Sequence, residues 1–422
     1  MLSLSKIREN TDAIQKRVSL KGEDIDFSSF LKLDEQHRKL LTEINDLRAE
    51  RNRASEKIAN VKRSGRNAAE TITAMRKVGE QIKSLETEAD ELREKIHSAI
   101  EVIPNVPHES VPLGNSEKDN KVVREWGEKP EFDYTIKDHV ELGSSLQLFD
   151  FERSAKISGS GFPLFIGQGA KLERALINFM LDYHLDHHKY TEIFPPFLVR
   201  SSAPFTCGQL PKFAEDMYYI EKDELYLIPT AEVPVTNIHM DEILDEQDLP
   251  KNYTAYSACF RREAGSYGKE TRGLLRVHQF NKVEMVKFVT PESSYKELEL
   301  LVSHAEAILQ TLGLHYRVIE LCAGDLSFSA AKCYDLEVWS PAENKWLEVS
   351  SCSNYEDFQA RRGNIRYRKS SNHKIDFVHT LNGSGVATPR LTVALLESYQ
   401  TPDGKVIVPK ALQPYVGTEV LG

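Results

Sequence analysis

The sequence predicts an α+β protein in which an antiparallel sheet carries packed helices and follows an N-terminal antiparallel two-helix coiled-coil arm. Two long stretches near the amino terminus repeat apolar residues in alternating steps of four and three, and a Pro-rich segment follows them. The remainder alternates helical segments with strand-like runs grouped in consecutive pairs. The helical segments extend over 171–188, 291–312 and 391–399, and the strand-like runs include 256–261 and 275–288. We therefore expect an N-terminal domain over residues 1–103, a linker over 104–130 and a main domain over 131–422.

Composition limits the class of protein. The 422 residues are 40% hydrophobic and 28% charged, which suffices for a sizeable core in about two or three domains and excludes a disordered or collagen-like chain. A net charge of −10 argues against a protein that coats nucleic acid over its whole surface, and leaves only a local basic patch for such contact.

Five cysteines without a C-x-x-C pair exclude a zinc ribbon and favour a reducing compartment. With no secretory signal and no apolar run of about 18 residues, we expect a cytoplasmic location and no membrane contact.

The arm is predicted by two coiled-coil seams. The first runs from Leu33 to Val61 and the second from Met75 to Ala99, and a polar turn around Gly65 separates them. Two helices of similar length joined by so short a turn must pack antiparallel. At about 1.5 Å per residue, roughly 35 residues make an arm on the order of 50 Å long.

The distal half of this arm is basic. Between Arg48 and Lys77 there are nine basic residues and three acidic ones. The ordinary interpretation is a solvated coiled-coil surface. On an acidic protein, such a cluster also suggests contact with a phosphate backbone through counterion release. The candidate contacts are Arg51, Lys57, Lys62 and Arg63.

Several motifs are missing or incomplete. The chain has no G-x-x-x-x-G-K-[ST] loop, and the residues after Gly383-Ser384-Gly385 do not continue a dinucleotide pattern. The spacing of His184, His187 and His188 is metal-like, but the glutamate of H-E-x-x-H is absent. We interpret these histidines as structural, at a helix C-terminus that favours cations.

The most informative block extends from Cys259 to Glu284 and is typical of a strand, a long polar loop and a second strand. With a period of two, one face of the second strand carries a cation, an aromatic ring and an acid, contributed by Arg276, His278, Phe280, Lys282 and Glu284. Such a face can pair Arg with phosphate, stack Phe on a base and offer Glu to a small polar ligand. The alternative is a solvated sheet face with cross-strand ion pairs.

Three motifs resemble those of class II aminoacyl-tRNA synthetases and occur in the expected order. Motif 2 (256–286) contains Phe260-Arg-Arg-Glu263, motif 3 (380–399) contains Asn382-Gly-Ser-Gly-Val-Ala-Thr-Pro-Arg390, and residues 170–197 resemble the dimer-building motif 1. Motif 3 places Arg390 at a helix amino end, which favours phosphate.

Further details resemble the bacterial type of the seryl-tRNA synthetase family over essentially the whole chain. They are the coiled coil and the segments Thr230-Ala-Glu232, Thr271-Arg-Gly-Leu-Leu-Arg-Val-His-Gln-Phe280 and Pro104-Asn-Val-Pro-His108. Arg262 departs from the smaller residue that we expect at this position in many relatives, but this touches no motif role on which the resemblance depends.

The resemblance implies the following site residues. Catalytic roles fall to Arg261, Glu348 and Arg390. ATP would contact Arg261, Arg262, Glu263, Arg276, Val277, Phe280, Glu348, Val349, Ser350, Ser351 and Arg390. L-serine would contact Thr230, Ala231, Glu232, Arg261, Glu284 and Ser384. Mg²⁺ would be held by Glu348 and Ser351, at the end of a strand over 346–350, since this ion prefers hard oxygen ligands.

The same resemblance implies a homodimeric ligase that forms seryl-adenylate from serine and ATP and then charges serine tRNA, with selenocysteine tRNA left open as a further acceptor. We expect the arm to select the tRNA, because residues 401–422 are too few for an anticodon-binding domain. Two alternatives remain open. One is a catalytically silent paralogue that binds RNA or a protein, which intact Arg261, Glu263, Glu348 and Arg390 argue against. The other is a carrier-protein aminoacylating relative, which we would expect to lack the arm.

Overall fold

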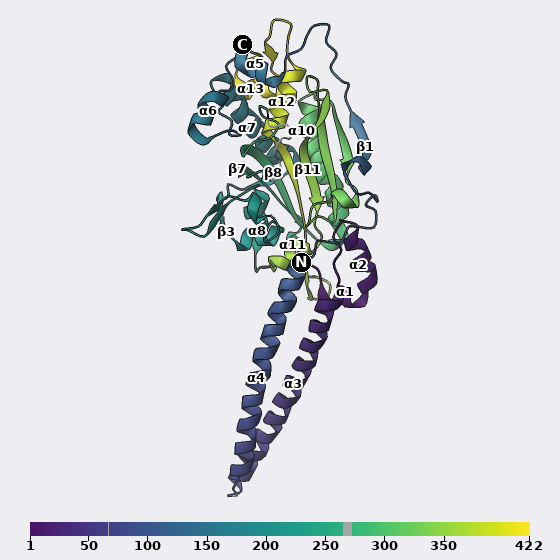
Figure 1. Cartoon of the computed structure of the whole chain (residues 1–422), viewed down its shortest axis with the longest axis vertical. Helices are drawn as coiled ribbons and strands as arrows, with labels where there is room; N and C mark the ends of the chain where they lie inside the picture. Colours follow the sequence, from purple (N-terminus) through teal and green to yellow (C-terminus); the bar gives the residue numbers. More distant parts are fainter. Residues whose placement is uncertain (66, 265–271) are drawn as a thin grey trace. The chain divides into compact units, whose positions relative to one another are not determined.

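The computed structural model describes residues 1–65, 67–264 and 272–422, and the chain divides into two compact units (Figure 1). The arm unit comprises Leu2–Ser19 and Glu23–Pro104. The body comprises Met1, Leu20–Gly22 and Asn105–Gly422. Each unit is described by itself below.

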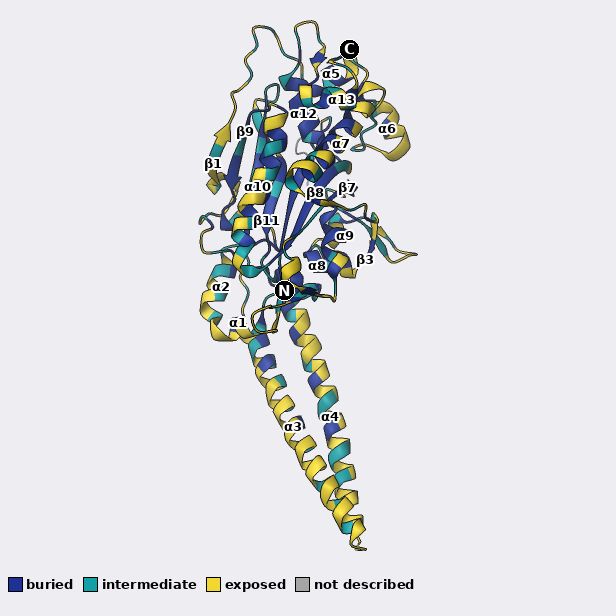
Figure 2. Cartoon of the chain, turned by 180° about the vertical axis from the view of Figure 1, so that it is seen from behind, coloured by how far each residue is buried: buried dark blue, intermediate teal, exposed yellow. Residues whose placement is uncertain are grey.

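The arm unit consists of four helices. They are α1 (Leu4–Glu9), α2 (Thr11–Ser19), α3 (Ser28–Arg63) and α4 (Ala69–Glu101). Along the pair α3 and α4, Ile44, Ile82 and Ala89 are buried, and partly buried residues pack on them: Leu40, Leu47, Val78 and Leu85. All of these residues belong to the two seams, so the predicted coiled coil is confirmed. Figure 2 shows that most of both helices is exposed around this narrow stripe.

An eight-stranded sheet forms the centre of the body, in the order β1-β9-β10-β11-β14-β8-β7-β2. Its strands are β1 (Lys121–Trp126), β2 (Thr191–Glu192), β7 (Lys251–Phe260), β8 (Gln279–Val289), β9 (Tyr316–Glu320), β10 (Lys332–Ser340), β11 (Lys345–Asn354) and β14 (His379–Ala387). All neighbours pair antiparallel except β2 and β7, which are parallel. The predicted α+β class with an antiparallel sheet is confirmed.

Residues 104–130 differ from the expected linker. Their second half contains β1, an edge strand whose Lys121 pairs with Glu320 and whose Trp126 pairs with Tyr316. The prolines and glycines before it suggested a tether. However, β-branched and aromatic residues such as Val122 and Val123 favour a strand where an open sheet edge offers backbone partners.

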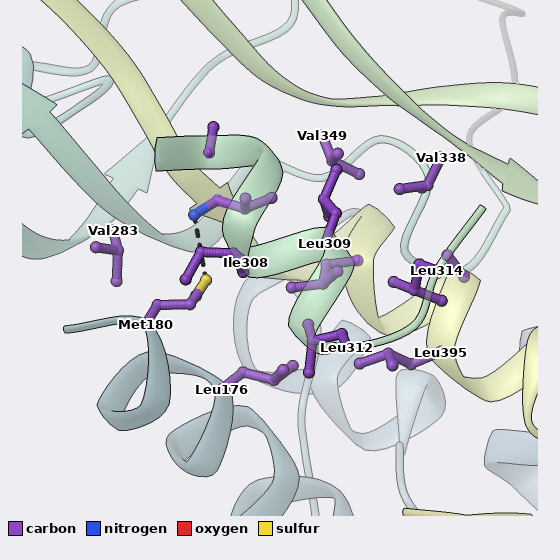
Figure 3. Packing of buried hydrophobic residues seen from close by; sticks show 14 of the residues in the cluster. Leu176, Met180, Val283, Ile308, Leu309, Leu312, Leu314, Val338, Val349 and Leu395 are labelled. Atoms are coloured by element: carbon purple, nitrogen blue, oxygen red, sulfur yellow. Dashed lines mark hydrogen bonds between the residues drawn. The ribbon is translucent and has the colours of Figure 1, made fainter. Parts of the chain in front are cut away.

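Three helices pack on the sheet around the main core: α7 (Gln168–His188), α10 (Ser294–Thr311) and α12 (Thr388–Ser398). They correspond to the helices predicted over 171–188, 291–312 and 391–399. In Figure 3, Leu176 and Met180 of α7 face Ile308, Leu309 and Leu312 at the end of α10. The Val386 N–H donates to Met180 Sδ over 3.1 Å, so α7 also supports the end of β14.

Smaller elements complete the body. The short helices are α5 (His139–Ser145), α6 (Phe151–Ser158), α8 (Ser202–Cys207), α9 (Glu232–Thr236), α11 (Phe358–Arg362) and α13 (Gln413–Val416). The minor sheets contain β3 (Leu198–Arg200), β4 (Tyr219–Ile220) and β5 (Leu225–Leu227); β6 (Ile243–Asp245), β12 (Arg366–Arg368) and β13 (Ile375–Phe377); and β15 (Val406–Ile407) and β16 (Val420–Leu421). Across the described ranges, none of the helices is both long and apolar enough to cross a membrane.

Candidate active site

One cavity of about 730 Å³ collects most of the predicted site residues. Strands β8, β11 and β14 and the start of α12 contribute to its walls. The predicted residues that line it are Thr230, Glu232, Arg261, Glu263, Arg276, Val277, Phe280, Glu284, Glu348, Val349, Ser350, Ser351, Ser384 and Arg390. These positions are up to 160 residues apart in the sequence, so only the fold brings them together.

Two predicted contacts do not line this cavity. Ala231 is fully buried at the start of α9 and packs in a small core with Val235. Arg262 is exposed, with its guanidinium 5.7 Å from the ring centre of Tyr218, and its backbone N–H donates to Asp216 O over 2.9 Å. Arg262 therefore faces away from the groups that its neighbours Arg261 and Glu263 meet.

A buried polar network forms the acidic end of the cavity. Glu284 is 2% exposed, and its Oε2 accepts from Thr230 Oγ1 over 2.9 Å and pairs with Lys282 Nζ at 2.5 Å. Lys282 and Glu284 are two residues apart on β8, so both point to the cavity, whereas Val283 points into the main core. The carboxylate is thus held in place with one ammonium partner beside it.

Glu232 lies next to this network. Its Oε1 accepts from Gln359 Nε2 over 2.7 Å. Burial, and then the nearby negative charge of Glu284, raise the pKa of the Glu232 carboxyl to about 7. Both acids border the same space.

A cationic and aromatic arrangement forms another wall. The Arg261 guanidinium lies 5.1 Å from the ring centre of Phe280, and its Nε donates to Pro229 O over 3.4 Å. Arg276 pairs with Glu263, whose backbone adopts a positive φ of 52°. Such an arrangement can bind a nucleotide, because an aromatic ring can stack on the base and a guanidinium can pair with the phosphate.

The second strand of motif 2 starts later than predicted. The sequence suggested a strand over 275–288, but β8 begins at Gln279, and Arg276 lies in the irregular segment before it. His278, expected on the ligand-facing side, instead holds the backbone, because its Nδ1 lies 3.0 Å from Arg261 O. The part of motif 2 over 265–271, including the motif residue Thr271, lies outside the described residues.

Arg390 lies at the first turn of α12, as motif 3 predicted. Its Nε donates to Leu275 O over 3.2 Å and its Nη1 to Glu348 O over 3.0 Å. The Glu348 carboxylate lies 3.7 Å from the same Nη1. The guanidinium is thereby fixed between motif 2 and β11 while it still borders the cavity.

A β-bulge on β11 explains how Glu348 and Ser351 both reach the cavity. Residues three apart in a regular strand point to opposite faces. Here Ser350 pairs with Leu336 and Glu348 with Glu337, so Val349 is an extra residue. The bulge shifts the alternation of side chains along the strand by one residue. The Glu348 carboxylate and the Ser351 hydroxyl therefore lie on the same side of β11.

Sequence reasoning missed several residues that line the cavity. Lys282 was placed on the correct face but given no role. The other lining residues to which no role was assigned are Cys207, Gly208, Gln209, Phe213, Asp216, Met217, Pro229, Leu274, Leu275, Ser327, Phe328, Ser329, Ser353, Tyr355, Asn382, Ala387 and Pro389. Of these, Leu274, Leu275, Asn382, Ala387 and Pro389 lie within segments that the sequence analysis singled out.

His184 of α7 supports the backbone, because it is buried and donates from Nε2 to Gly385 O over 3.0 Å. Burial lowers the pKa of this imidazole to about 4, so its role is structural but does not depend on a positive charge at the helix C-terminus. Within the ranges that the structure describes, one group meets the distances for a metal ion: His139, Glu343 and Glu397. Both ring nitrogens of His139 already have protein partners, because Nε2 accepts from Leu274 N over 3.2 Å and Nδ1 faces Glu397 at 3.2 Å.

Two family models match the chain. Residues 1–107 match the seryl-tRNA synthetase N-terminal domain, and residues 215–399 match the class II tRNA synthetase core domain (G, H, P, S and T). Curated relatives include serine–tRNA ligases of Chloroherpeton thalassium, 55% identical over 100% of both chains, and of Syntrophobacter fumaroxidans, 54% identical over 99% of both.

Solved structures agree with these matches. Seryl-tRNA synthetase from Pyrococcus horikoshii complexed with ATP superposes with a TM-score of 0.93 at 40% identity and covers 100% of this chain and 99% of that one. Cytoplasmic serine–tRNA ligase from Naegleria fowleri in complex with AMP gives 0.89 at 28% identity, over 100% and 98%. Because the seryl-tRNA synthetase N-terminal domain matches residues 1–107 and serine–tRNA ligases more than 50% identical span the whole chain, the chain belongs to the seryl-tRNA synthetase family.

Proposed function

We propose that the 730 Å³ cavity activates L-serine with ATP and that the enzyme then transfers serine to the 3′ end of serine tRNA. By its family, the chain is a serine–tRNA ligase. The observation that carries the assignment of the site is the pairing of two arginines and an aromatic ring with a buried acidic network inside one cavity. The two ends suit the two substrates of the first step.

ATP binds at the cationic end of the cavity, which is the wall formed by Arg261, Arg276 and Phe280. Phe280 offers a face for the adenine, and Glu263 supplies a carboxylate beside it. Arg261 meets the α-phosphate and the serine carboxylate, and Arg390 meets the γ-phosphate, because its guanidinium is already oriented by Leu275 O and Glu348 O. Preorganised cations cost no reorganisation as charge develops in the transition state.

Serine takes the acidic end. Glu284 accepts from the serine hydroxyl, and Thr230, Glu232 and Ser384 complete the pocket. The Thr230 and Lys282 contacts to Oε2 fix the carboxylate of Glu284 before serine arrives. Alanine is rejected, because it would leave this buried carboxylate without its partner, which costs more than a lost apolar contact.

The donors present suit a magnesium ion. Glu348 and Ser351 offer a half-exposed carboxylate and a hydroxyl on one side of β11, and both border the cavity. Mg²⁺ commonly takes one or two protein oxygens and completes its shell with water and phosphates. When bound, the ion would neutralise charge on the phosphates of ATP.

The reaction needs positioning and charge neutralisation rather than a side-chain nucleophile. A carboxylate oxygen of serine attacks the α-phosphorus, and the bond to pyrophosphate breaks. A ribose hydroxyl at the tRNA terminus then attacks the acyl carbon, and AMP leaves. Arg261 and Arg390 hold the reacting phosphates in line during the first of these steps.

The arm supplies the tRNA contact. Arg51, Lys57, Lys62 and Arg63 are all exposed on the described part of α3. A basic coiled-coil surface binds the phosphate backbone and reads the shape of the RNA. Selenocysteine tRNA remains a further acceptor to test on the same surface.

The quaternary structure and the location belong to the same proposal. We infer a homodimer, because a groove of about 490 Å³ along α7 exposes Phe194, which is 76% accessible. We infer a cytoplasmic location, because all five cysteines are free and buried.

Serine-dependent exchange between ATP and pyrophosphate tests the site. The full-length protein should catalyse exchange with L-serine and far less with L-alanine or L-threonine. If serine promotes no exchange while the protein still binds tRNA, the chain is the catalytically silent paralogue and the proposed function is wrong.

A further inference from the structure

A short loop in the body contributes a wall of the cavity that none of the three motifs includes. Ser327, Phe328 and Ser329 line the cavity, and the last two are 6% and 8% exposed. This loop has no regular secondary structure of its own between Asp325 and β10. Its shape therefore depends on what its backbone carbonyls bind.

Lys21 binds three of these carbonyls. Its Nζ donates to Ser327 O over 2.8 Å, to Phe328 O over 3.2 Å and to Ala330 O over 2.7 Å. Lys21 lies in the short stretch Leu20–Gly22 that belongs to the body. Three carbonyl acceptors surround this one nitrogen, so the lysine acts as a clamp on the loop.

Asn105 binds the remaining carbonyl and two more. Its backbone N–H donates to Phe328 O over 2.9 Å, and its Nδ2 donates to Ser329 O over 2.9 Å and to Tyr355 O over 2.8 Å. The side chain is 4% exposed. All four consecutive carbonyls, from 327 to 330, are therefore held by Lys21 and Asn105 together.

The clamp lies at the serine end of the cavity. Tyr355, whose carbonyl Asn105 holds, donates from its hydroxyl to Asn382 Oδ1 over 2.9 Å, and Asn382 lines the cavity two residues before Ser384. Ser329 packs closely on Gly208, where an added Cβ would lie 3.0 Å from the Ser329 Cβ. With so little free space, a small shift of the loop would reach the pocket wall.

We propose that Lys21 and Asn105 are positioning residues for serine binding, which act by clamping the 327–330 loop against the cavity. This inference rests on the proposed function for the assignment of the serine end. It gives a role to the segment Pro104–His108, which was notable in the sequence but lies outside the catalytic motifs. His108 extends the clamp, because its backbone N–H donates to Ala331 O over 2.8 Å.

Two variants of the full-length protein test the clamp, each with a matched control. Lys21→Met keeps the apolar stem and removes the ammonium, and its control is Lys16→Met on the exposed side of α2. Asn105→Ala removes the amide. Its control is Asn115→Ala, because Asn115 also lies in the segment 104–130 but is exposed and does not line the cavity.

Steady-state exchange kinetics should separate the substrates. We expect each clamp variant to raise the Michaelis constant for serine about tenfold, as the loss of buried hydrogen bonds implies. The constant for ATP and the turnover number should stay within about twofold, because Arg261, Phe280 and Arg390 are held by other elements. Both controls should keep wild-type constants for both substrates.

Hydrogen exchange provides a readout that does not depend on activity. Amides of the peptide over 322–334 should exchange faster in the clamp variants than in the controls. If Asn105→Ala does not fold, Lys21→Met alone decides. The inference is wrong if the soluble variants keep the wild-type constant for serine, if the constants for serine and ATP rise equally, or if only the thermal stability falls. A wild-type protein without serine-dependent exchange would refute the proposed function, whereas unchanged hydrogen exchange at 322–334 would refute the clamp.

Discussion

Glu284 shows how a single acid is prepared for a small polar ligand. It is 2% exposed, yet its Oε2 has two fixed partners, Thr230 and Lys282. A buried carboxylate with a charged partner remains ionised at lower cost than an isolated one. Its geometry is therefore set by β8 and the loop before α9 before any substrate is present.

Replacing this acid tests the assignment of the serine end. Glu284→Gln should raise the Michaelis constant for serine by one to two orders of magnitude, because a charge-assisted hydrogen bond is lost. The constant for ATP should change much less. Glu337→Gln is the control, since Glu337 on β10 pairs with Arg317 on β9 and does not line the cavity. A large rise for ATP with serine unaffected would contradict the assignment.

Glu232 makes a pH-dependent contribution to stability. Its carboxyl has a pKa of about 7 in the folded protein, above the ordinary value of 4.5, because of burial and then Glu284. Between these two values the folded state binds more protons than the unfolded state, so the free energy of unfolding falls as pH rises.

Glu232→Gln should remove this slope. Relative to the wild type, the variant should gain stability from pH 4.5 to 7.5, on the order of 3 kcal/mol. Urea unfolding at several pH values without substrates measures the difference, and Glu128→Gln, on the surface, is the control. A constant offset between Glu232→Gln and wild type at all pH values would contradict the raised pKa.

At the scale of single elements, β11 shows why a strand prediction does not place a site. Its residues were correctly predicted as a strand, although it continues beyond 350 to Asn354. The extra residue at Val349 is visible only in the pairing with β10. Because the bulge re-aims Ser351 to the side of Glu348, an alternation argument alone would have separated the two proposed ligands.

The proposed tRNA contacts of the two arm helices lie on exposed side chains. Neutralising Arg51, Lys57, Lys62 and Arg63 to Gln should weaken binding of serine tRNA and reduce the salt dependence by roughly one unit of log-log slope per lost phosphate contact. Serine-dependent exchange should be unchanged, because these residues are exposed and none lines the cavity.

A matched set of basic residues controls for net charge. Lys32, Lys83, Arg93 and Lys95 are exposed on the same two helices but outside the basic stretch from Arg48 to Lys77. Changing them to Gln removes as much charge. Equal losses of tRNA binding for both sets would show that overall charge, rather than the distal arm, attracts the RNA.

The whole molecule is proposed to act as a symmetric dimer. The groove along α7 includes Ile177, Leu181 and Phe194, and it also contains Glu173, which is 6% exposed. Among the described residues, Glu173 Oε2 has no hydrogen-bond partner. A groove that exposes Phe194 and holds a buried acceptor fits an isologous contact with a second copy.

Phe194→Asp should shift the protein to a monomer at micromolar concentration, because it places a charge in the apolar contact. Analytical ultracentrifugation measures the change. Ile157→Asp is the control, since Ile157 is 74% exposed on α6 and does not line the groove. A wild-type protein that sediments as a monomer would contradict the dimer directly.

The sequence by itself determined the elements whose signal is local. Apolar steps of four and three gave α3 and α4, and a period of two gave the ligand-facing side of β8 with Phe280, Lys282 and Glu284. Local periodicity suffices here, because each element must bury one stripe or one face wherever it packs. The three motifs then indicated the synthetase family, because all of them occur in this chain and in the expected order.

Only the tertiary structure decided how the walls of the cavity meet. Thr230 and Glu284 are 54 positions apart, and Lys21 lies 306 positions from Ser327. Such pairs leave no periodic trace in the sequence, since they depend on how segments far apart in the chain meet in the fold. Side-chain burial and backbone pairing at long range, rather than local propensity, assemble the site.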